Sequence, residues 1–388
     1  MTQRNISIDL SKNQSLLLKC IAICAMLCHH TFCFPPEVVD SHFCWLTLQI
    51  GEIGKVCVSI FLFVSGYGLY KQYNSLISKV SALSVNKFQN TDNQVVSRKN
   101  KYTGRVVIWL KETVKFEIKR FIKFYTNYWV IFLIFVPIGV FVFSIPLSKS
   151  YGEGSDILTS LVVDIMGFKG LESYNITWWY NKVILTFYLI FPLLYYAVKK
   201  CGWLVLLIAM MWMNHNHIDC LWYWHDWLFS FVFGMCSIRY KEQIESFVKK
   251  IGKNWSVVVA VLFTVFWIAE RQYAIIPYYG SFIMGTRSDG FIAFGIFMIV
   301  CLCPIPKIAN KIMCLIGSHS ANIYLFHTFI RSRWFPTYIY ATEYAVVSVL
   351  TLLFVCLGLS WCIEFIKEKC AINKLSQYCI SSIVNCSF

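Results

Sequence analysis

The sequence predicts an all-α membrane protein, a polytopic helical bundle with about ten transmembrane helices and both termini in the cytoplasm. Composition is the first indication. Of the 388 residues, 57% are hydrophobic and only 14% are charged, against about 45–50% and about 25% in soluble proteins. So few charges cannot cover the surfaces of soluble domains of this total length. Aromatic residues make up 18% of the chain, which excludes a disordered protein.

Apolar stretches of about 20 residues mark the expected spans. The first begins after a polar segment and has no small-x-small cleavage site, so we interpret it as a span and not as a signal peptide. The expected spans cover residues 16–34, 52–70, 127–147, 178–198, 201–218, 222–238, 255–270, 289–303, 312–330 and 344–363.

The positive charges predict the orientation of these spans. Most of the 35 Lys and Arg residues lie in the segments 71–126, 199–200, 239–253 and 307–311 and in the two tails. By the positive-inside rule, these segments are cytoplasmic. Basic loops of this kind also account for the net charge of +15. Because no nucleic-acid-binding motif accompanies that charge, we expect a lipid bilayer as a partner and no nucleic acid.

The chain divides into a cytoplasmic N-terminal tail (1–14), a transmembrane domain (15–363) and a cytoplasmic C-terminal tail (364–388). Within the domain, residues 75–104 form a polar cytoplasmic insert rich in Ser, Asn, Gln and Lys, for which we expect a flexible loop. Residues 106–123 have the pattern of a basic amphipathic helix, expected on the inner membrane surface.

The first span contains ionisable residues that are costly in a membrane, Lys19 near one end and His29 with His30 near the middle. Eleven residues of helix separate Lys19 from His30, which leaves an offset of about 20° and a separation of about 16 Å on one face. His29 points about 80° away, toward a neighbouring helix. For Lys19 the alternative is a snorkelling anchor, and for His30 it is a structural hydrogen bond.

Six segments carry recognisable motifs, in residues 19–30, 59–67, 120–129, 178–194, 231–235 and 317–327. In this order they resemble signatures of the membrane-bound acyltransferase 3 family. The first is a basic residue, ten residues and His; the last is Gly-x-x-Ser-x-x-Ile-Tyr-Leu-x-His. The resemblance covers about residues 14–363. The chain departs from the family at Lys19 and Lys123, which replace Arg and lose its bidentate fork, at Thr126, which replaces Pro, and at Ile184, which replaces a common Glu.

The resemblance implies an integral-membrane O-acyltransferase of the bacterial inner (plasma) membrane. Its acyl group, expected to be acetyl, would come from acyl-CoA. The acceptor would be a hydroxyl of a cell-surface or capsular glycan or of its lipid-linked precursor. No permanently bound cofactor is expected. The alternative is a transporter or flippase for a lipid or glycan. A transporter should show paired, broken spans in two halves, whereas the basic and His residues here cluster in spans one to three, which favours the enzyme.

The motif residues suit acyl transfer chemically. A desolvated imidazole at His30 stays neutral near pH 7 and is the expected catalytic base. The phosphates of the acyl donor are expected to bind to Lys19, Arg120 and Lys123. The alternative for Arg120 and Lys123 is that they are ordinary cytoplasmic charges of the positive-inside rule, with no role in binding. Residues expected to stabilise the oxyanion or position substrate are Ser65, Tyr128, Trp179, Ser320, Tyr324 and His327.

A second cluster of polar residues follows the fifth span, with His215, His217 and Asp219, then His225 and Asp226. Such a cluster fits zinc or copper. The intervening Trp and Tyr residues instead indicate an interfacial aromatic belt. We therefore expect no metal, and a loop that binds the acceptor or is purely structural.

Overall fold

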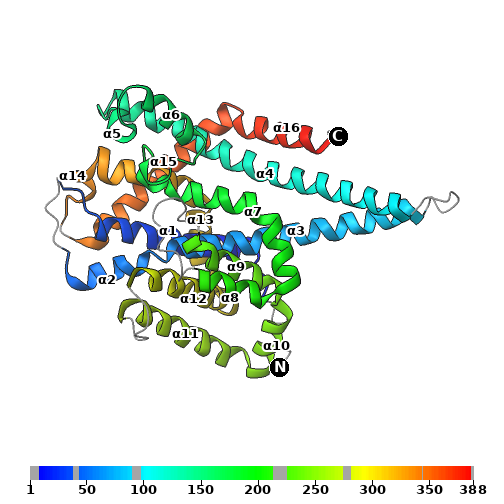
Figure 1. The fold of residues 1–388 in the computed structure, drawn as a ribbon. Coiled ribbons are helices and arrows are strands. Elements are labelled where there is room, and N and C mark those ends of the chain that lie inside the picture. The colour runs from blue at the N-terminus through cyan, green and yellow to red at the C-terminus, as the bar shows by residue number, and fades with distance from the viewer. Residues whose placement is uncertain are drawn as a thin grey trace.

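The computed structural model describes residues 8–37, 43–89, 98–212, 225–273, 281–342 and 344–385. Every regular element in these ranges is a helix, which confirms the all-α prediction. Figure 1 shows the helices packed side by side as one bundle, from which α3 and α4 extend together to one side. The elements are α1 (Lys12–Cys33), α2 (Trp45–Gly54), α3 (Cys57–Gln89), α4 (Arg98–Phe141), α5 (Ser148–Tyr151), α6 (Ser155–Ile165), η1 (Gly170–Glu172), η2 (Ile176–Trp178), α7 (Trp179–Cys201), α8 (Trp203–Trp212), α9 (His225–Arg239), α10 (Lys241–Ile251), α11 (Lys253–Tyr273), α12 (Ser281–Leu302), α13 (Lys307–Thr328), η3 (Phe329–Trp334), α14 (Pro336–Ile339), α15 (Ala345–Lys369) and α16 (Ile372–Asn385).

Six helical segments in the described residues are long and apolar enough to cross a membrane. They are Lys12–Cys33, Trp45–Ser81, Val106–Phe141, Ile176–Cys201, Lys253–Tyr273 and Ala345–Lys369. Three shorter apolar helices, Trp203–Trp212, Trp227–Arg239 and Ser288–Leu302, coincide with three further expected spans. The remaining expected span, 312–330, falls on α13, which packs along α1. The chain is thus a multi-pass helical membrane protein, while the count of about ten stays a prediction.

Glycines set the closest contacts between these helices. A Cβ atom at Gly66 of α3 would lie 2.1 Å from the Phe231 carbonyl oxygen, and one at Gly234 of α9 would lie 2.1 Å from the Phe63 carbonyl oxygen. The two helices therefore meet backbone to backbone, with a glycine on each side. Small residues allow such an approach where lipid gives no hydrophobic drive for helix association.

The prediction of a flexible loop over 75–104 is wrong for the described part of that segment. Helix α3 continues to Gln89 and α4 begins at Arg98. Residues 75–89 and 98–103 contain no Gly or Pro, so both described parts can continue the helices that enter them. Helix α4 also unites the expected amphipathic helix at 106–123 with the following span in one helix of 44 residues.

The first described residues are fixed to the bundle. The backbone N–H of Ile8 donates to Glu245 of α10 (2.8 Å), and the Asp9 carboxylate pairs with Lys71 of α3 (2.5 Å) and Lys241 of α10 (3.6 Å). Burial alone would raise the pKa of Asp9, but the hydrogen bond from Lys71 and the two positive charges hold that pKa below its ordinary value. Ser11 then caps α1 in a capping box with Gln14.

The segment between α4 and α7 folds around the buried carboxylate of Asp164. One Asp164 oxygen accepts the Tyr151 hydroxyl (2.6 Å) and the Tyr174 backbone N–H (2.7 Å). The Tyr128 hydroxyl donates to the Asp164 backbone oxygen (2.6 Å). Burial raises the pKa of Asp164 and outweighs these hydrogen bonds, which lower it. This cluster ties α4 to α6 and to the loop before α7.

Candidate active site

Two cavities follow one another along the same four helices, α1, α3, α7 and α13. We call the first the basic cavity; its volume is about 370 Å³. It is lined by Lys19, Phe61, Ser65, Arg120, Lys123, Phe124, Asn127, Tyr180, Asn181, Ile184, Tyr188, Ser320, Ala321, Tyr324 and Leu325. We call the second the histidine cavity; its volume is about 360 Å³. It is lined by His29, His30, Phe34, Glu52, Lys55, Cys57, Val58, Leu171, Ile176, Thr177, Trp179, Thr328 and Arg331.

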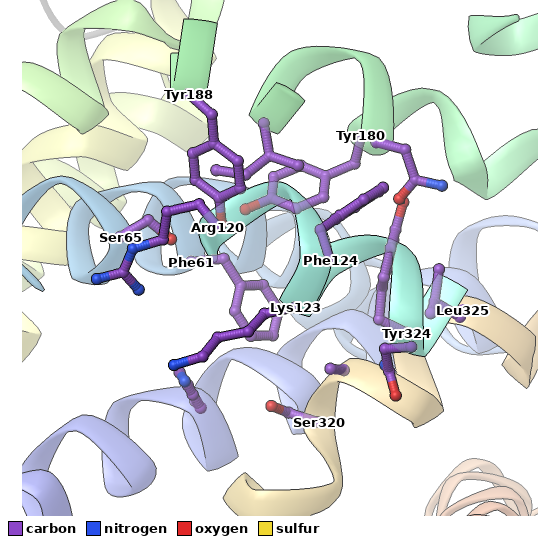
Figure 2. Close-up of a pocket in the computed structure, with 15 residues that line it drawn as sticks. Phe61, Ser65, Arg120, Lys123, Phe124, Tyr180, Tyr188, Ser320, Tyr324 and Leu325 are labelled. Carbon is purple, nitrogen blue, oxygen red and sulfur yellow. The ribbon is translucent and has the colours of Figure 1, made fainter. Parts of the chain in front are cut away.

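The basic cavity combines three cations with aromatic walls and has no carboxylate among its lining residues. Figure 2 shows the rings of Tyr180 and Tyr188 from α7 around the space into which α4 carries Arg120 and Lys123. Arg120 is held in place, because its guanidinium donates to Gln72 of α3 and lies 4.9 Å over the ring of Phe116. The cavity is therefore suited to an anionic ligand that also has an apolar or planar part.

His29 and His30 both line the histidine cavity, although the helix geometry predicted that His29 would point toward a neighbouring helix. The Nδ1 atom of His29 lies 2.8 Å from the carbonyl oxygen of Gly51 in α2. A carbonyl can only accept, so Nδ1 carries the proton and Nε2 keeps its lone pair. In the described part of the chain, His30 contacts its neighbours through ring packing, 5.3 Å from His29 and 5.0 Å from His327 between ring centroids.

A layer of hydrogen-bonded polar groups lies between the two cavities. His327 is fully buried, and its Nδ1 lies within 3.1 Å of the Ile323 and 2.9 Å of the Tyr324 carbonyl oxygen. Its Nε2 is 3.2 Å from the Thr328 hydroxyl, which in turn lies 3.3 Å from the hydroxyl of Thr177. Tyr324, which lines the basic cavity, donates to the Thr177 carbonyl oxygen (2.6 Å). This hydrogen bond links the wall of one cavity to the wall of the other.

The predicted site residues fall into three groups. In the histidine cavity are His30 and Trp179. Two line neither cavity: Tyr128, whose hydroxyl is bound to Asp164, and the enclosed His327. The basic cavity contains Lys19, Ser65, Arg120, Lys123, Ser320 and Tyr324.

The structure adds charged residues that the sequence reasoning did not place at a site. Glu52, Lys55 and Arg331 line the histidine cavity. In the sequence, Arg331 directly follows the expected span 312–330. One signal for it was present, because Arg331 follows His327 by four residues, which is one helical turn.

The His and Asp cluster after the fifth expected span, for which we expected no metal, lies largely outside the described residues. His215, His217 and Asp219 are not in the described ranges, and α9 begins at His225. Within those ranges, no group of three His, Cys, Asp or Glu side chains is arranged to hold a metal ion.

Comparison with known proteins gives one match. The sequence model of the acyltransferase 3 family, described as an acyltransferase domain, matches residues 7–364. No curated protein and no solved structure matches the chain.

Proposed function

Because the chain belongs to the acyltransferase 3 family, we propose that this membrane acyltransferase moves an acetyl group from acyl-CoA to a hydroxyl of a cell-surface or capsular glycan or of its lipid-linked precursor. The donor acts as a substrate, and no permanently bound cofactor takes part. The family membership favours an enzyme over the transporter or flippase considered from the sequence alone.

The basic cavity is the observation that carries this proposal. Lys19, Arg120 and Lys123 line it without a compensating carboxylate, and phosphate groups are the natural partners of such a set. Ile184, at the position where the family commonly has Glu, also lines this cavity, so its net positive charge is not reduced there. The aromatic walls suit the planar adenine of CoA.

The reaction takes place where the two cavities meet. As the acceptor oxygen attacks the thioester carbon, His30 accepts the hydroxyl proton. Ser65 and Ser320, which line the basic cavity, help to position the donor there. The carbon–sulfur bond then breaks, and the proton held by His30 passes to the departing thiolate. The products are the acylated glycan and CoA.

The orientation follows from the charges. In the bacterial inner membrane, the basic segments 71–126 and 239–253 lie in the cytoplasm, and the basic cavity faces the compartment that contains acyl-CoA. Asp9 contributes, since it binds Lys71 and Lys241 from these two segments and so keeps the N-terminal segment on their side.

A topology experiment tests this orientation. A Ser84→Cys variant, probed on intact cells with a thiol reagent that does not cross membranes, should stay unlabelled until the membrane is opened. Labelling on intact cells would place segment 71–126 outside and would reverse the proposed arrangement.

The function itself is tested by mass analysis of surface glycans from cells with and without the gene. The proposal predicts the loss of one acetyl-sized mass from the glycan repeat unit, restored by the intact gene but not by a His30→Ala variant. Glycans of full length and unchanged mass would rule out this acceptor class.

A further inference from the structure

Arg331 is a buried charge in the lining of the histidine cavity. Its side chain is only 4% exposed and lines the cavity one turn after His327. The Nη1 atom donates to the Phe34 carbonyl oxygen and to the Tyr340 hydroxyl (3.1 Å), and Tyr340 donates in turn to the Thr31 carbonyl oxygen (3.0 Å). One edge of the guanidinium is thus fixed by the ends of α1 and α14.

The Nε edge of the same guanidinium has no such partner. The Nε atom is buried and makes no hydrogen bond to any residue that the structure describes. No carboxylate of the described residues lies within ion-pair distance of Arg331. A buried donor without an acceptor is costly, and a buried guanidinium without a counterion is more so. A ligand that supplies an anionic oxygen would remove this cost.

The net charge of the histidine cavity also favours an anionic ligand. Its ionisable lining residues other than histidine are Glu52, Lys55 and Arg331. With the histidines neutral, the lining carries one excess positive charge. The basic cavity already provides for the phosphates of the donor. The remaining ligand of the proposed reaction, the acceptor, is therefore the molecule that fits this charge.

We propose that Arg331 binds an anionic group of the acceptor, the carboxylate of an acidic sugar or a phosphate, and so holds the acceptor hydroxyl beside His30. This inference rests on the proposed function, because it assumes that a glycan acceptor enters the histidine cavity. Trp179 and Phe34 line the same space and provide aromatic faces on which a sugar ring stacks.

Thermal unfolding of the purified protein in detergent tests the binding step without a known acceptor. The probes are glucuronate, inorganic phosphate and glucose at equal ionic strength. Glucuronate or phosphate should raise the unfolding temperature and glucose should not. A response to glucuronate identifies an acidic sugar, and a response to phosphate alone identifies a phosphate-bearing acceptor.

The variants locate the response. Arg331→Gln should weaken the anion affinity by about ten- to a hundredfold, and Arg331→Lys, which keeps the charge but not the fork, by less. If Arg331→Gln does not fold, Arg331→Lys decides alone. Arg333→Gln is the matched control, because Arg333 lies two residues further on, 5.1 Å over the ring of Tyr174 and outside the cavity. Arg120→Gln should remove any response that arises in the basic cavity.

An anion response that is unchanged in the Arg331 variants, or equal for glucose and glucuronate, would overturn the inference. So would a transfer assay in which Arg331→Lys lowers kcat while the KM for the acceptor stays constant, because that result would assign Arg331 to the oxyanion. If the intact protein transfers no acyl group at all but the anion response depends on Arg331, the proposed function fails and the binding site remains.

Discussion

The basic cavity and the histidine cavity use the same four helices but hold their charges differently. In the basic cavity, the cations are long side chains on α1 and α4; Arg120 is held by the side chain of Gln72, and Lys123 is exposed. In the histidine cavity, the polar groups are fixed by main-chain carbonyls, His29 by Gly51 and Arg331 by Phe34. The first arrangement suits attraction of a charged substrate, whereas the second suits accurate placement of reacting groups. Substitution of the cations that bind the donor in the basic cavity should therefore act on the KM for acyl-CoA, and substitution of the proposed base in the histidine cavity should act on kcat.

The largest expected effect comes from the proposed base. His30→Ala should lower acyl transfer by about 10²–10⁴-fold, the usual contribution of a general base, while the protein still accumulates in the membrane. The measurement is acetyl transfer from labelled acetyl-CoA in membranes with matched amounts of protein.

His29→Ala is the control for this experiment. It removes the hydrogen bond to Gly51, so some loss is expected, but activity should remain measurable. Full activity in His30→Ala together with none in His29→Ala would show that the base is the neighbouring histidine, whose Nε2 the structure leaves able to accept a proton.

Arg120→Ala should act on the KM for acyl-CoA and not on kcat. Loss of a charged hydrogen-bonding group that binds a phosphate costs about 1.5–3 kcal/mol, so the KM for acyl-CoA should rise about tenfold or more and kcat should change little. Lys249→Ala on the exposed surface of α10 controls for the general loss of positive charge. A fall in kcat at unchanged KM would remove the distinction between the cavities.

Tyr324→Phe addresses the contact between the cavities. It deletes the hydroxyl that donates to Thr177 and leaves the ring in place. A neutral hydrogen bond contributes about 0.5–1.5 kcal/mol, so kcat should fall by a few-fold to about tenfold, with the KM for acyl-CoA nearly constant. Tyr378→Phe, at an exposed position of α16, should have no effect on either constant.

The smallest effect on activity is expected at Asp164, which lies outside both cavities. Asp164→Asn should leave the activity per folded molecule unchanged but lower the unfolding temperature, because the neutral amide oxygen is a weaker acceptor than the carboxylate oxygen for the two hydrogen bonds.

The pH dependence of stability gives a second readout at Asp164. Its folded-state pKa is raised from 3.8, so this group should reduce stability as the pH rises from about the unfolded value through the folded one. Asp164→Asn should flatten this dependence, measured by thermal unfolding in detergent across the acidic range. An unchanged slope would show that another group causes it.

The sequence alone predicted the helical class and identified the motif segments that line the cavities. Lys19, Ser65, Arg120 and Ser320 come from four separate segments and line one cavity. Their spacing along each helix was visible in the sequence, but their depth in the bundle was not. For that reason Lys19 and His30, placed on one face of α1, turn out to line successive cavities and not a single one.

Other features required the tertiary structure. The motif residue Tyr128 binds Asp164, whose position beside it depends on the fold of residues 142–175. Gly66, Gly234 and Gly317, also within motifs, each face the backbone of another helix. A motif alone does not distinguish packing from chemistry. Arg331 is the opposite case, a residue outside the motifs that lines a cavity. The sequence analysis missed it because its burial depends on contacts with the ends of α1 and α14.

The backbone contact between α3 and α9 has a consequence for the choice of acyl group. Ser65, on the wall of the basic cavity, precedes Gly66, whose position is fixed by the Phe231 main chain. This side of the cavity cannot move outward to admit a bulkier ligand, because a main-chain contact yields far less than a side chain. We therefore expect the cavity to accept a short acyl chain and to exclude a long or branched one.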